Sequence, residues 1–337
     1  MRLSLIVPVY NGEAFLSECL ESLRKQKIED MEIIVIDDGS TDSSLKIARS
    51  FEELDQRFHV YTKTNEGVSM ARNLGLSYAK GDFVGFLDAD DSIDEGAYET
   101  LLEKINGHEA LFFGYRESYR DQDHIRIIQP EKTGIVNGEE ALYQCFLPIG
   151  VGYFTAVWNK IFKRELVKDV LFDKELKIGE DELWLTQVMK KIDDVVLVNT
   201  AYYNYVQLKS STLHSEYTLN AKWRSAIQAK KEAMKLLNKD SKIYPLFCAK
   251  FYDDLFQLSW FTYINNDEEG QRYIKEILDP FKKDFYASEM HSRKKKMRYF
   301  LISKMIGMHM PKKLVKVAGE ARSYHAKMFF SKGNENG

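Results

Sequence analysis

The sequence predicts an α/β protein with a mostly parallel sheet flanked by helices and a helical extension at the C-terminus. Apolar runs of strand length alternate with helical patterns through the first 115 residues. Strands separated by helices of about 10–15 residues form βαβ units, whose right-handed crossovers place helices on both faces of the sheet. The pattern after residue 217 is helical.

The strands of the first 115 residues are recognised by short apolar runs rich in β-branched and aromatic residues. They are expected at residues 3–9, 32–37, 58–61, 83–87 and 111–115. Helices between them are indicated by apolar residues three and four positions apart, at 15–23, 45–54, 68–79 and 98–105. Ser40 or Thr41 is placed to cap the second of these helices.

Beyond residue 115 the pattern weakens. Residues 121–124 are polar and predict a turn or a lid. Alternating α/β character returns in residues 158–198, with a helix expected at 182–191. Three further helices are expected at 221–237, 244–263 and 271–278. We therefore predict an α/β domain in residues 1–216 and a helical region in residues 217–337 with a basic amphipathic end.

The charge is distributed unevenly along a chain of ordinary globular composition, 44% hydrophobic and 29% charged. The net charge of −3 argues against nucleic acid as a partner of the whole surface. Residues 291–330 hold 11 Lys or Arg and one acid, which leaves 37 basic and 50 acidic residues elsewhere. Apolar residues are mixed with these basic ones, which favours an interfacial helix on an anionic membrane. The alternative is a helix packed on the rest of the protein.

The cysteines and the apolar runs bear on the compartment. Cys19, Cys145 and Cys248 are scattered among apolar neighbours, as expected of buried thiols in a reducing compartment. No stretch reaches the ~18 apolar residues that a membrane-spanning helix needs. We expect a cytoplasmic protein whose basic end can hold it peripherally to the inner face of the cell membrane.

Acidic turns follow two of the expected strands. Residues 36–42 read IDDGSTD and residues 86–91 read FLDADD. Ligands of open α/β sheets bind outside the carboxyl ends of the strands, so both turns lie where such a fold binds its ligand. The second turn packs three carboxylates into four residues, a repulsion that a divalent cation or a bound donor group relieves. Taken alone, the first turn is equally a helix cap.

Six motifs in order resemble family 2 glycosyltransferases of the GT-A fold, of the type that builds bacterial surface polysaccharides. They are IVPVYN (6–11), IDDGSTD (36–42), ARN (71–73), FLDADD (86–91), WNK (158–160) and GED (179–181). One such motif is weak, but six at ordinary spacing are specific. The resemblance is strong over residues 1–115, moderate over 153–215 and absent after about 217. It implies an inverting, metal-dependent transfer of a sugar from a nucleotide-sugar, expected to be a UDP-sugar, to a hydroxyl of a glycan or lipid-linked acceptor.

The resemblance places the donor nucleotide against residues from four of these motifs. They are Pro8, Val9, Tyr10, Asn11, Asp38, Arg72, Asp88 and Ala89. Asp38 would accept a hydrogen bond from the uracil imide N–H, and Arg72 would pair with an aspartate of the acidic turns or with the diphosphate. From the residues alone, the Pro8 and Asn11 segment merely ends a strand, and Arg72 lies on the polar face of a helix.

The metal and the general base are also implied by the resemblance. Asp88 and Asp90 match the DxD motif of the family, which binds Mn²⁺ or Mg²⁺ mostly through diphosphate oxygens and water. Asp91 is expected to cap the next helix. Asp181, with Glu180 as the alternative, would act as the general base toward the acceptor hydroxyl. From the residues alone, the two acids simply stabilise a helix N-terminus.

Further candidates are assigned to the acceptor and diphosphate side. They are Trp158, Asn159, Lys160, Lys209 and Ser211. Core packing is the alternative for the first three, and a buried strand that ends in a loop is the alternative for the last two. His214 could supply a metal ligand, although a lone exposed histidine is commoner.

Two rival functions compete with this assignment. A sugar-nucleotide nucleotidyltransferase shares the α/β architecture, but it should carry a Gly-rich phosphate loop where this chain has Tyr10-Asn11-Gly12-Glu13. The chain has no GxGxxG or GxxxxGK motif, which argues against dehydrogenases and P-loop enzymes. A non-catalytic glycosyltransferase-like partner that docks a membrane complex is the other rival, and the intact acidic turns argue against it.

Overall fold

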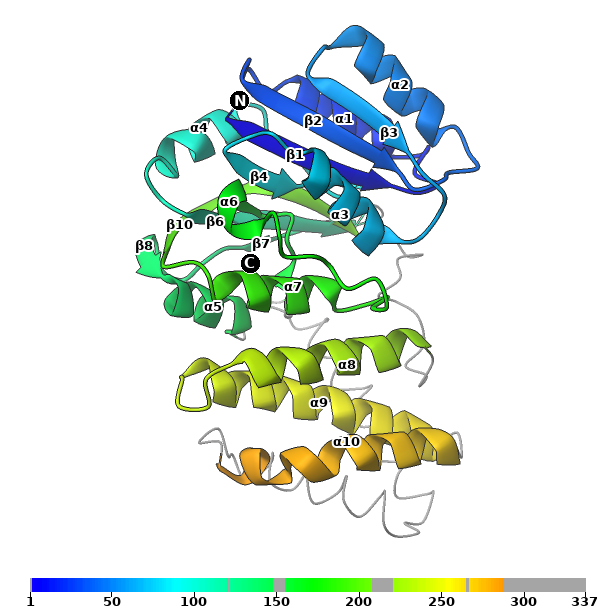
Figure 1. The fold of residues 1–337 in the computed structure, drawn as a ribbon, viewed down its shortest axis with the longest axis vertical. Helices are drawn as coiled ribbons and strands as arrows, with labels where there is room; N and C mark the ends of the chain where they lie inside the picture. The colour runs from blue at the N-terminus through cyan, green and yellow to red at the C-terminus, as the bar shows by residue number, and fades with distance from the viewer. Residues whose placement is uncertain (1, 120–121, 148–154, 208–220, 265–266, 288–337) are drawn as a thin grey trace. The chain divides into compact units, whose positions relative to one another are not determined.

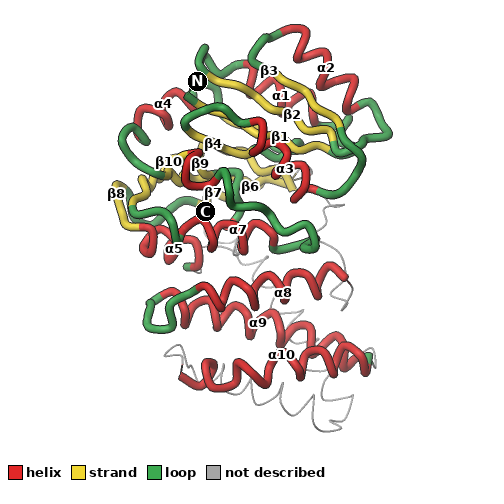
Figure 2. Tube along the Cα trace, in the orientation of Figure 1, coloured by secondary structure: helices red, strands yellow, loops and turns green. Residues whose placement is uncertain are grey.

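The computed structural model describes residues 2–119, 122–147, 155–207, 221–264 and 267–287 (Figure 1, Figure 2). Contacts divide the chain into two compact units. One comprises residues 1–215 and 228–243, and the other comprises residues 216–227 and 244–337. The first unit therefore takes in residues 228–243, which the sequence analysis places in the helical region.

The N-terminal half of the sheet is parallel. Its strands are β1 (Leu3–Val9), β2 (Met31–Asp37), β3 (Phe58–Thr62) and β4 (Phe83–Phe86). They lie in the order β3-β2-β1-β4. All residues of β1 and β2 are buried, as expected of strands covered on both faces, and this is why both sequences are almost unbroken apolar runs.

Helices cover both faces of this parallel half. They are α1 (Leu16–Arg24), α2 (Ser44–Leu54) and α3 (Val68–Tyr78). The strand order runs one way from β1 to β3 and returns to β4, so right-handed crossovers place α1 and α2 on one face and α3 on the other (Figure 1). Gly75 lets α3 approach β1 closely, because a Cβ atom there would collide with the side chain of Ile6.

The other half of the sheet is mixed. Its strands are β5 (Ser92–Ile93), β6 (Ala110–Tyr119), β7 (Gln122–Ile128), β8 (Gly134–Asn137), β9 (Lys160–Lys163) and β10 (Asp194–Gln207). β9 lies antiparallel between β4 and β6, whereas β10 runs parallel to β6. β5 and β8 pair antiparallel with β10, and β7 with β6. The predicted α/β fold class is confirmed, with the parallel pairs confined to β3-β2-β1-β4 and β6-β10.

Seven more helices are described. They are α4 (Ala97–Lys104), α5 (Gly138–Phe146), α6 (Arg164–Val167), α7 (Glu180–Met189), α8 (Ala221–Leu236), α9 (Ile243–Ile264) and α10 (Glu268–Ala287). All three cysteines are free and buried, as predicted. Within the described ranges, no helix combines the length and the apolar character needed to cross a bilayer.

Two local predictions are wrong. Residues 121–124 were expected to form a turn or a lid, but strand β7 begins at Gln122 and pairs with β6. β7 has a single described neighbour, so polar residues at its start do not interrupt the pairing. Neither Ser40 nor Thr41 caps α2, which begins at Ser44, whose N–H donates to Asp42 Oδ1 at 2.9 Å. Both residues bond instead to Asn11 in the loop after β1. Ser40 Oγ accepts from the N–H of Asn11, and the N–H of Thr41 donates to Asn11 Oδ1.

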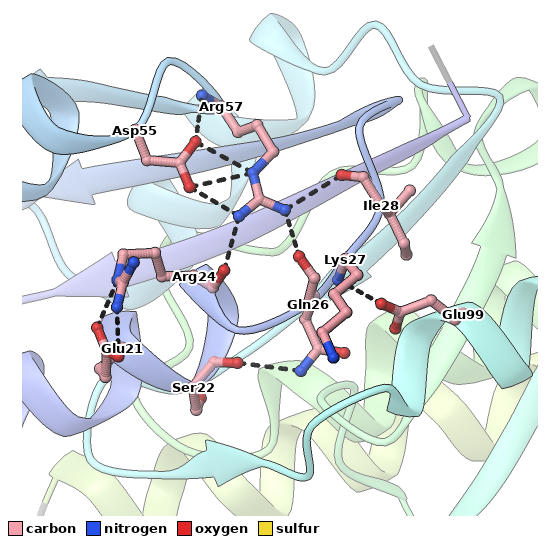
Figure 3. Close-up of polar contacts among 9 residues, drawn as sticks. All are labelled: Glu21, Ser22, Arg24, Gln26, Lys27, Ile28, Asp55, Arg57 and Glu99. Atoms are coloured by element: carbon pink, nitrogen blue, oxygen red, sulfur yellow. Dashed lines mark hydrogen bonds and ion pairs between the residues drawn. The ribbon is translucent and has the colours of Figure 1, made fainter.

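Arg57 joins the end of α1 and the residues beyond it to Asp55, which follows α2 (Figure 3). These residues precede β2 and β3 and so lie at the amino ends of the strands, whereas the acidic turns follow the carboxyl ends. The guanidinium of Arg57 binds the carboxylate of Asp55 through Nε and through Nη2, the latter at 2.7 Å. It also donates to the backbone carbonyls of Arg24, Gln26 and Ile28 at the end of α1 and just beyond it. Carbonyls at a helix C-terminus lack helical N–H partners, so one side chain supplies the missing donors before β2 begins.

Arg57→Ala is expected to lower the free energy of unfolding by about 2–4 kcal/mol, because three carbonyls lose their guanidinium donor and Asp55 keeps only the backbone N–H of residue 57. Arg49→Ala is the matched control, since Arg49 pairs with Glu52 on an exposed helix face. Its loss should stay within about 0.5 kcal/mol. Urea unfolding of both variants measures the difference, and equal losses would show that the Arg57 contacts contribute little.

Candidate active site

The turn after β4 lies beyond the carboxyl end of the parallel sheet. Leu87 continues the strand pairing by donating its N–H to the carbonyl of Ile6 at 3.0 Å, and Asp88 is the next residue. Strands β1 and β2 end at the same level, because their last residues, Val9 and Asp37, are paired. The loops that follow these strands therefore begin side by side. The fold therefore brings the acidic turns and the loop after β1 to one edge, as the sequence analysis expected.

Arg72 of α3 joins two of the predicted motifs. Its Nη1 donates to Asp181 at 2.6 Å and to Glu180 at 3.0 Å, and its Nη2 donates to Asp88 at 3.1 Å. The side chain of Arg72 is only 4% exposed, and its Cζ lies 5.4 Å from the centre of the Phe172 ring. Of the two expected partners of Arg72, the structure shows the acidic turn, and it adds the acids of α7.

Three carboxylates around one guanidinium leave an excess of negative charge. Burial raises the pKa of Asp181 and Arg72 lowers it, while Glu180 and Asp88 raise it further, to about 8 in total. Burial alone would lower the pKa of Arg72, but the three carboxylates outweigh burial and raise it. Asp181 nevertheless keeps 21% of its side chain exposed. In its ionised form, a carboxylate with a raised pKa accepts a proton more readily than an ordinary carboxylate does.

The start of α7 supports both acids locally. Gly179 precedes the helix with a φ of +87°, a left-handed conformation that favours glycine. Glu180 and Asp181 lie in the first turn, where the helix dipole stabilises negative charge. Glu180 and Asp181 therefore lie where they stabilise the N-terminus of α7, which is the simpler role suggested by the residues alone. Their contacts with Arg72 are additional to this role.

The DxD turn offers two carboxylates of different character. Asp88 is tied to Arg72, whereas the side chain of Asp90 is open to solvent. Protein atoms crowded around Asp90, and then the charge of Asp88, raise the pKa of Asp90 to about 6 despite that opening. Nowhere in the described part of the chain do three or more His, Cys, Asp or Glu residues form a group that could hold a metal. Two hard oxygen donors beside surplus negative charge suit Mg²⁺ or Mn²⁺ bound mainly through substrate phosphates.

The prediction that Asp91 caps the next helix is wrong. α4 begins at Ala97 after Gly96, with no side-chain cap. Asp91 is instead buried, and it accepts hydrogen bonds from the Tyr203 hydroxyl at 2.6 Å and from the Val206 N–H at 2.9 Å. The short strand β5 separates the acidic turn from α4, which places Asp91 too far back to serve as a cap.

The loops after β1 and β2 are fastened to each other. Asn11 has a φ of +50°, which asparagine tolerates better than most residues. Its Oδ1 accepts from the N–H of Thr41 at 2.9 Å, and its own N–H donates to Ser40 Oγ at 3.0 Å. Pro8 and Val9 are buried in β1, whereas Tyr10 is 52% exposed beside this junction. Among the residues assigned to the nucleotide base, Tyr10 therefore offers an aromatic ring that is exposed to solvent.

Asp38 holds the segment that leads into α3. Its Oδ1 accepts from Lys63 Nζ at 2.8 Å and from the N–H of Glu66 at 3.1 Å. Its Oδ2 accepts from the N–H of Gly67 at 2.7 Å. Asp38 therefore does not cap α2, which was the simpler interpretation of this turn. Its assignment to the base stays a prediction.

Trp158, Asn159 and Lys160 are all buried. Trp158 stacks on Tyr203 with ring centres 4.2 Å apart, and Asn159 Nδ2 donates to the carbonyl of Phe113 at 2.8 Å. Lys160 Nζ donates to Asn159 Oδ1 at 2.7 Å, and burial lowers the pKa of Lys160 to about 8. These contacts agree with the core-packing alternative, so contact with the acceptor stays a prediction. The other candidates of this group, Lys209, Ser211 and His214, lie outside the described residues.

Two residues that support the site belong to no motif that the sequence analysis used. Phe172 lies under the guanidinium of Arg72, and Tyr203 binds the acidic turn. Tyr203 had a signal, because Tyr203 and Tyr205 alternate along an apolar strand pattern and so share one face. Phe172 lies in an irregular segment before α7, where no periodicity marks it.

Comparisons with known proteins identify relatives of the chain. The sequence profile of the family described as "Glycosyl transferase family 2" matches residues 4–171. The uncharacterized glycosyltransferase EpsJ of Bacillus subtilis is 29% identical over 218 residues, which cover 64% of this chain and 63% of EpsJ. The GalNAc(5)-diNAcBac-PP-undecaprenol beta-1,3-glucosyltransferase of Campylobacter jejuni is 30% identical over 192 residues, 56% of this chain and 60% of that protein. The chain thus spans about three fifths of the length of these two relatives.

A solved structure has the same fold. Residues 1–349 of TarS from S. aureus, in complex with UDP-GlcNAc, superimpose with a TM-score of 0.71 at 22% identity. The match covers 91% of this chain and 88% of that chain. At this identity the likeness establishes the fold, and it supports the GT-A architecture expected from the sequence.

Replacing Arg72 tests the charge balance of the site. Arg72→Met should lower the free energy of unfolding by roughly 3–5 kcal/mol at pH 9, because it leaves buried carboxylates without their cation. The loss should be smaller at pH 6. At pH 6 the carboxyl of Asp181, whose pKa is about 8, holds its proton in both folded chains, so this proton contributes equally to both. Above pH 8 the unchanged chain releases the proton, whereas the folded variant lacks the cation that lowers this pKa and keeps it, so the variant loses stability relative to the unchanged chain.

Urea unfolding at pH 6 and pH 9 measures this difference between Arg72→Met and the unchanged chain. Arg116→Met is the control, since Arg116 pairs with Asp94 where both side chains are about one third exposed. A loss for Arg72→Met that is equal at both pH values would contradict the proposed coupling between Arg72 and the carboxylates.

Proposed function

The chain belongs to glycosyl transferase family 2 through residues 4–171, and we propose that it transfers a sugar from a UDP-sugar to a hydroxyl of a glycan or lipid-linked acceptor. The observation that carries this proposal is the contact of Arg72 with both the DxD turn and the acids of α7. This contact supports a proposed donor site beside a proposed general base. The C. jejuni relative is named for an undecaprenol-linked acceptor and TarS was solved with UDP-GlcNAc, which supports the substrate classes and a role in cell-surface polysaccharide synthesis.

The proposed reaction is a single displacement with inversion. The acceptor oxygen attacks the anomeric carbon from the face opposite the diphosphate, and the bond between that carbon and the diphosphate oxygen breaks. Asp181 takes the proton of the acceptor hydroxyl, with Glu180 as the alternative base. The raised pKa of Asp181 and its partial exposure support this role. No nucleophilic protein residue is required in a single step.

We assign Asp90 and Asp88 as ligands of Mn²⁺ or Mg²⁺. Such an ion, when bound, stabilises the negative charge that develops on the leaving diphosphate. Asp90 is the better placed of the two, because Asp88 already bonds to Arg72 while Asp90 faces solvent. Arg72 compensates part of the negative charge of Asp88, Glu180 and Asp181, the three carboxylates that it contacts.

The nucleotide is assigned to the junction of the loops after β1 and β2. The exposed ring of Tyr10 offers an apolar face to the base. A carboxylate has about four acceptor positions, and three donors occupy those of Asp38, which leaves one on Oδ2 for an imide N–H. Pro8, Val9 and Asn11 would shape this pocket, and Ala89 would lie beside the ribose in the DxD turn.

The rival without catalysis is less consistent with the site. Burying a guanidinium and several carboxylates is costly in free energy, and replacing such groups by apolar residues often stabilises a protein. A docking partner would gain nothing from keeping this arrangement below the surface. An enzyme gains a fixed base beside its donor.

The proposal is tested by incubating the protein with UDP-sugars and Mn²⁺ and measuring the release of UDP. The unchanged chain should release UDP with Mn²⁺ and not with EDTA, and Asp90→Asn should lose most of this activity without unfolding. Asp82→Asn, an exposed aspartate at the other end of the same strand, should behave like the unchanged chain. If no UDP-sugar gives Mn²⁺-dependent release, the enzymatic proposal is wrong, and full activity in Asp90→Asn would refute the metal assignment alone.

Asp181→Asn should bind UDP normally and reduce the transfer rate by about 10²–10⁴-fold, since proton removal matters only in the chemical step. Glu180→Gln is the matched control, because Glu180 bonds to the same nitrogen of Arg72. Calorimetric UDP binding and kcat separate the two effects. If Glu180→Gln alone abolishes transfer, the roles of the two acids are exchanged.

We also propose peripheral attachment to an anionic membrane through residues 291–330, which lie outside the described residues. The support is their excess of ten positive charges. Each basic residue near an anionic leaflet contributes about 1 kcal/mol, screened by salt. The full chain should therefore sediment with anionic vesicles at low salt, less so at high salt, and less after Lys294, Lys295 and Lys296 are changed to Gln. A chain that ignores these vesicles at low salt uses the segment for packing instead.

A further inference from the structure

A single phenol oxygen holds both ends of the DxD turn. The Tyr203 hydroxyl donates to Asp91 Oδ2 at 2.6 Å and accepts from the backbone N–H of Asp88 at 3.3 Å. The N–H of Asp91 donates to the carbonyl of Asp88 at 3.1 Å, which closes the turn between these two points. The other carboxylate oxygen of Asp91 accepts from the N–H of Val206 at 2.9 Å. The turn is therefore attached to β10 through three hydrogen bonds.

The position of Tyr203 is itself set by packing. Its side chain is fully buried, and its ring stacks on Trp158 with centres 4.2 Å apart and planes 17° apart. The ring of Trp158 in turn packs nearly perpendicular to the ring of Tyr115, with ring centres 4.8 Å apart. Since the rings cannot shift without disrupting this core, the hydroxyl is a fixed point from which the turn is held.

The turn needs such a fixed point because it carries carboxylates that repel one another. Asp88 and Asp90 are two residues apart in the same turn, so their negative charges repel one another. Repulsion of this kind favours an opened turn in which the two side chains point apart. Hydrogen bonds to the backbone of Asp88 and to the side chain of Asp91 oppose that opening on both sides of Asp90.

We propose that Tyr203 and Asp91 are positioning residues for donor binding, which hold Asp88 and Asp90 in the arrangement that binds a divalent cation with UDP. This inference rests on the proposed function. Neither residue need touch the donor. Residues that orient metal ligands typically contribute roughly 10- to 100-fold to metal affinity or activity, and the two buried partners of the turn are expected to do the same here.

The test measures how UDP binding depends on Mn²⁺. Tyr203→Phe keeps the ring and removes only the hydroxyl. It should raise the Mn²⁺ concentration required for UDP binding by roughly 10- to 100-fold. UDP binding in EDTA should not change, and saturating Mn²⁺ should restore most of the affinity. A purely structural role would lower the melting temperature without altering the Mn²⁺ requirement.

Two further variants make the result decisive. Tyr115→Phe removes a hydroxyl from the same aromatic cluster, on β6, and should leave the Mn²⁺ requirement unchanged. Asp91→Asn keeps the shape and an acceptor for Val206 while weakening the bond to Tyr203, so it should shift the requirement in the same direction even where Tyr203→Phe folds poorly. If both Tyr203→Phe and Asp91→Asn bind Mn²⁺ and UDP like Tyr115→Phe, the inference is overturned. If the unchanged chain itself shows no Mn²⁺-dependent UDP binding, the proposed function fails and the positioning role falls with it.

Discussion

The buried guanidinium of Arg72 is the interaction on which the site depends. Its three carboxylate partners come from the turn after β4 and from the start of α7, which are about 90 residues apart in the sequence. A cation removed from water requires anions nearby, and buried anions require a cation, so each element is held in place by the others. The close approach of α3 to β1 at Gly75 is what brings Arg72 within reach of both. The placement of α3, of the turn after β4 and of the start of α7 therefore depends on the balance of charge around Arg72.

A second arginine shows how differently the same side chain is used at the amino ends of the strands. Arg57 directs its donors mainly at backbone carbonyls, which have no other helical partner, and it meets one carboxylate. Its contacts complete the hydrogen bonding of a loop and involve no surplus charge. Arg72 faces three carboxylates, and burial, followed by the charges of Glu180 and Asp88, raises the pKa of Asp181. The carboxyl ends of the strands therefore carry the candidate active site, and the amino ends carry hydrogen bonds that complete a loop.

The sequence predicted the parallel half of the sheet well and the mixed half poorly, for a physical reason. Strand β1 is covered on both faces, so its apolar run marks both ends, and the predicted bounds match the structure. β7 and β8 lie at margins of the sheet and expose Ile125, Ile127 and Ile135, so neither alternation nor burial distinguishes them from loops. In the site, the motifs identified Asp88 and Asp181 as candidates through resemblance. That one arginine binds both, and that Tyr203 holds the turn, depends on pairings distant in sequence that no local pattern contains.

The three aspartates of the DxD turn divide their tasks because neighbouring residues of a turn point in different directions. Asp88 is balanced by Arg72, and Asp91 is buried against the hydroxyl of Tyr203. For Asp90, the described residues supply no cationic partner within ion-pair distance, and the pKa of its carboxyl is raised to about 6. A carboxylate whose charge the protein leaves uncompensated is the place where binding a cation gains most. The acidic run is therefore tolerated in part because Asp88 pairs with Arg72 and Asp91 accepts two hydrogen bonds inside the fold, and the proposed cation would satisfy the third carboxylate.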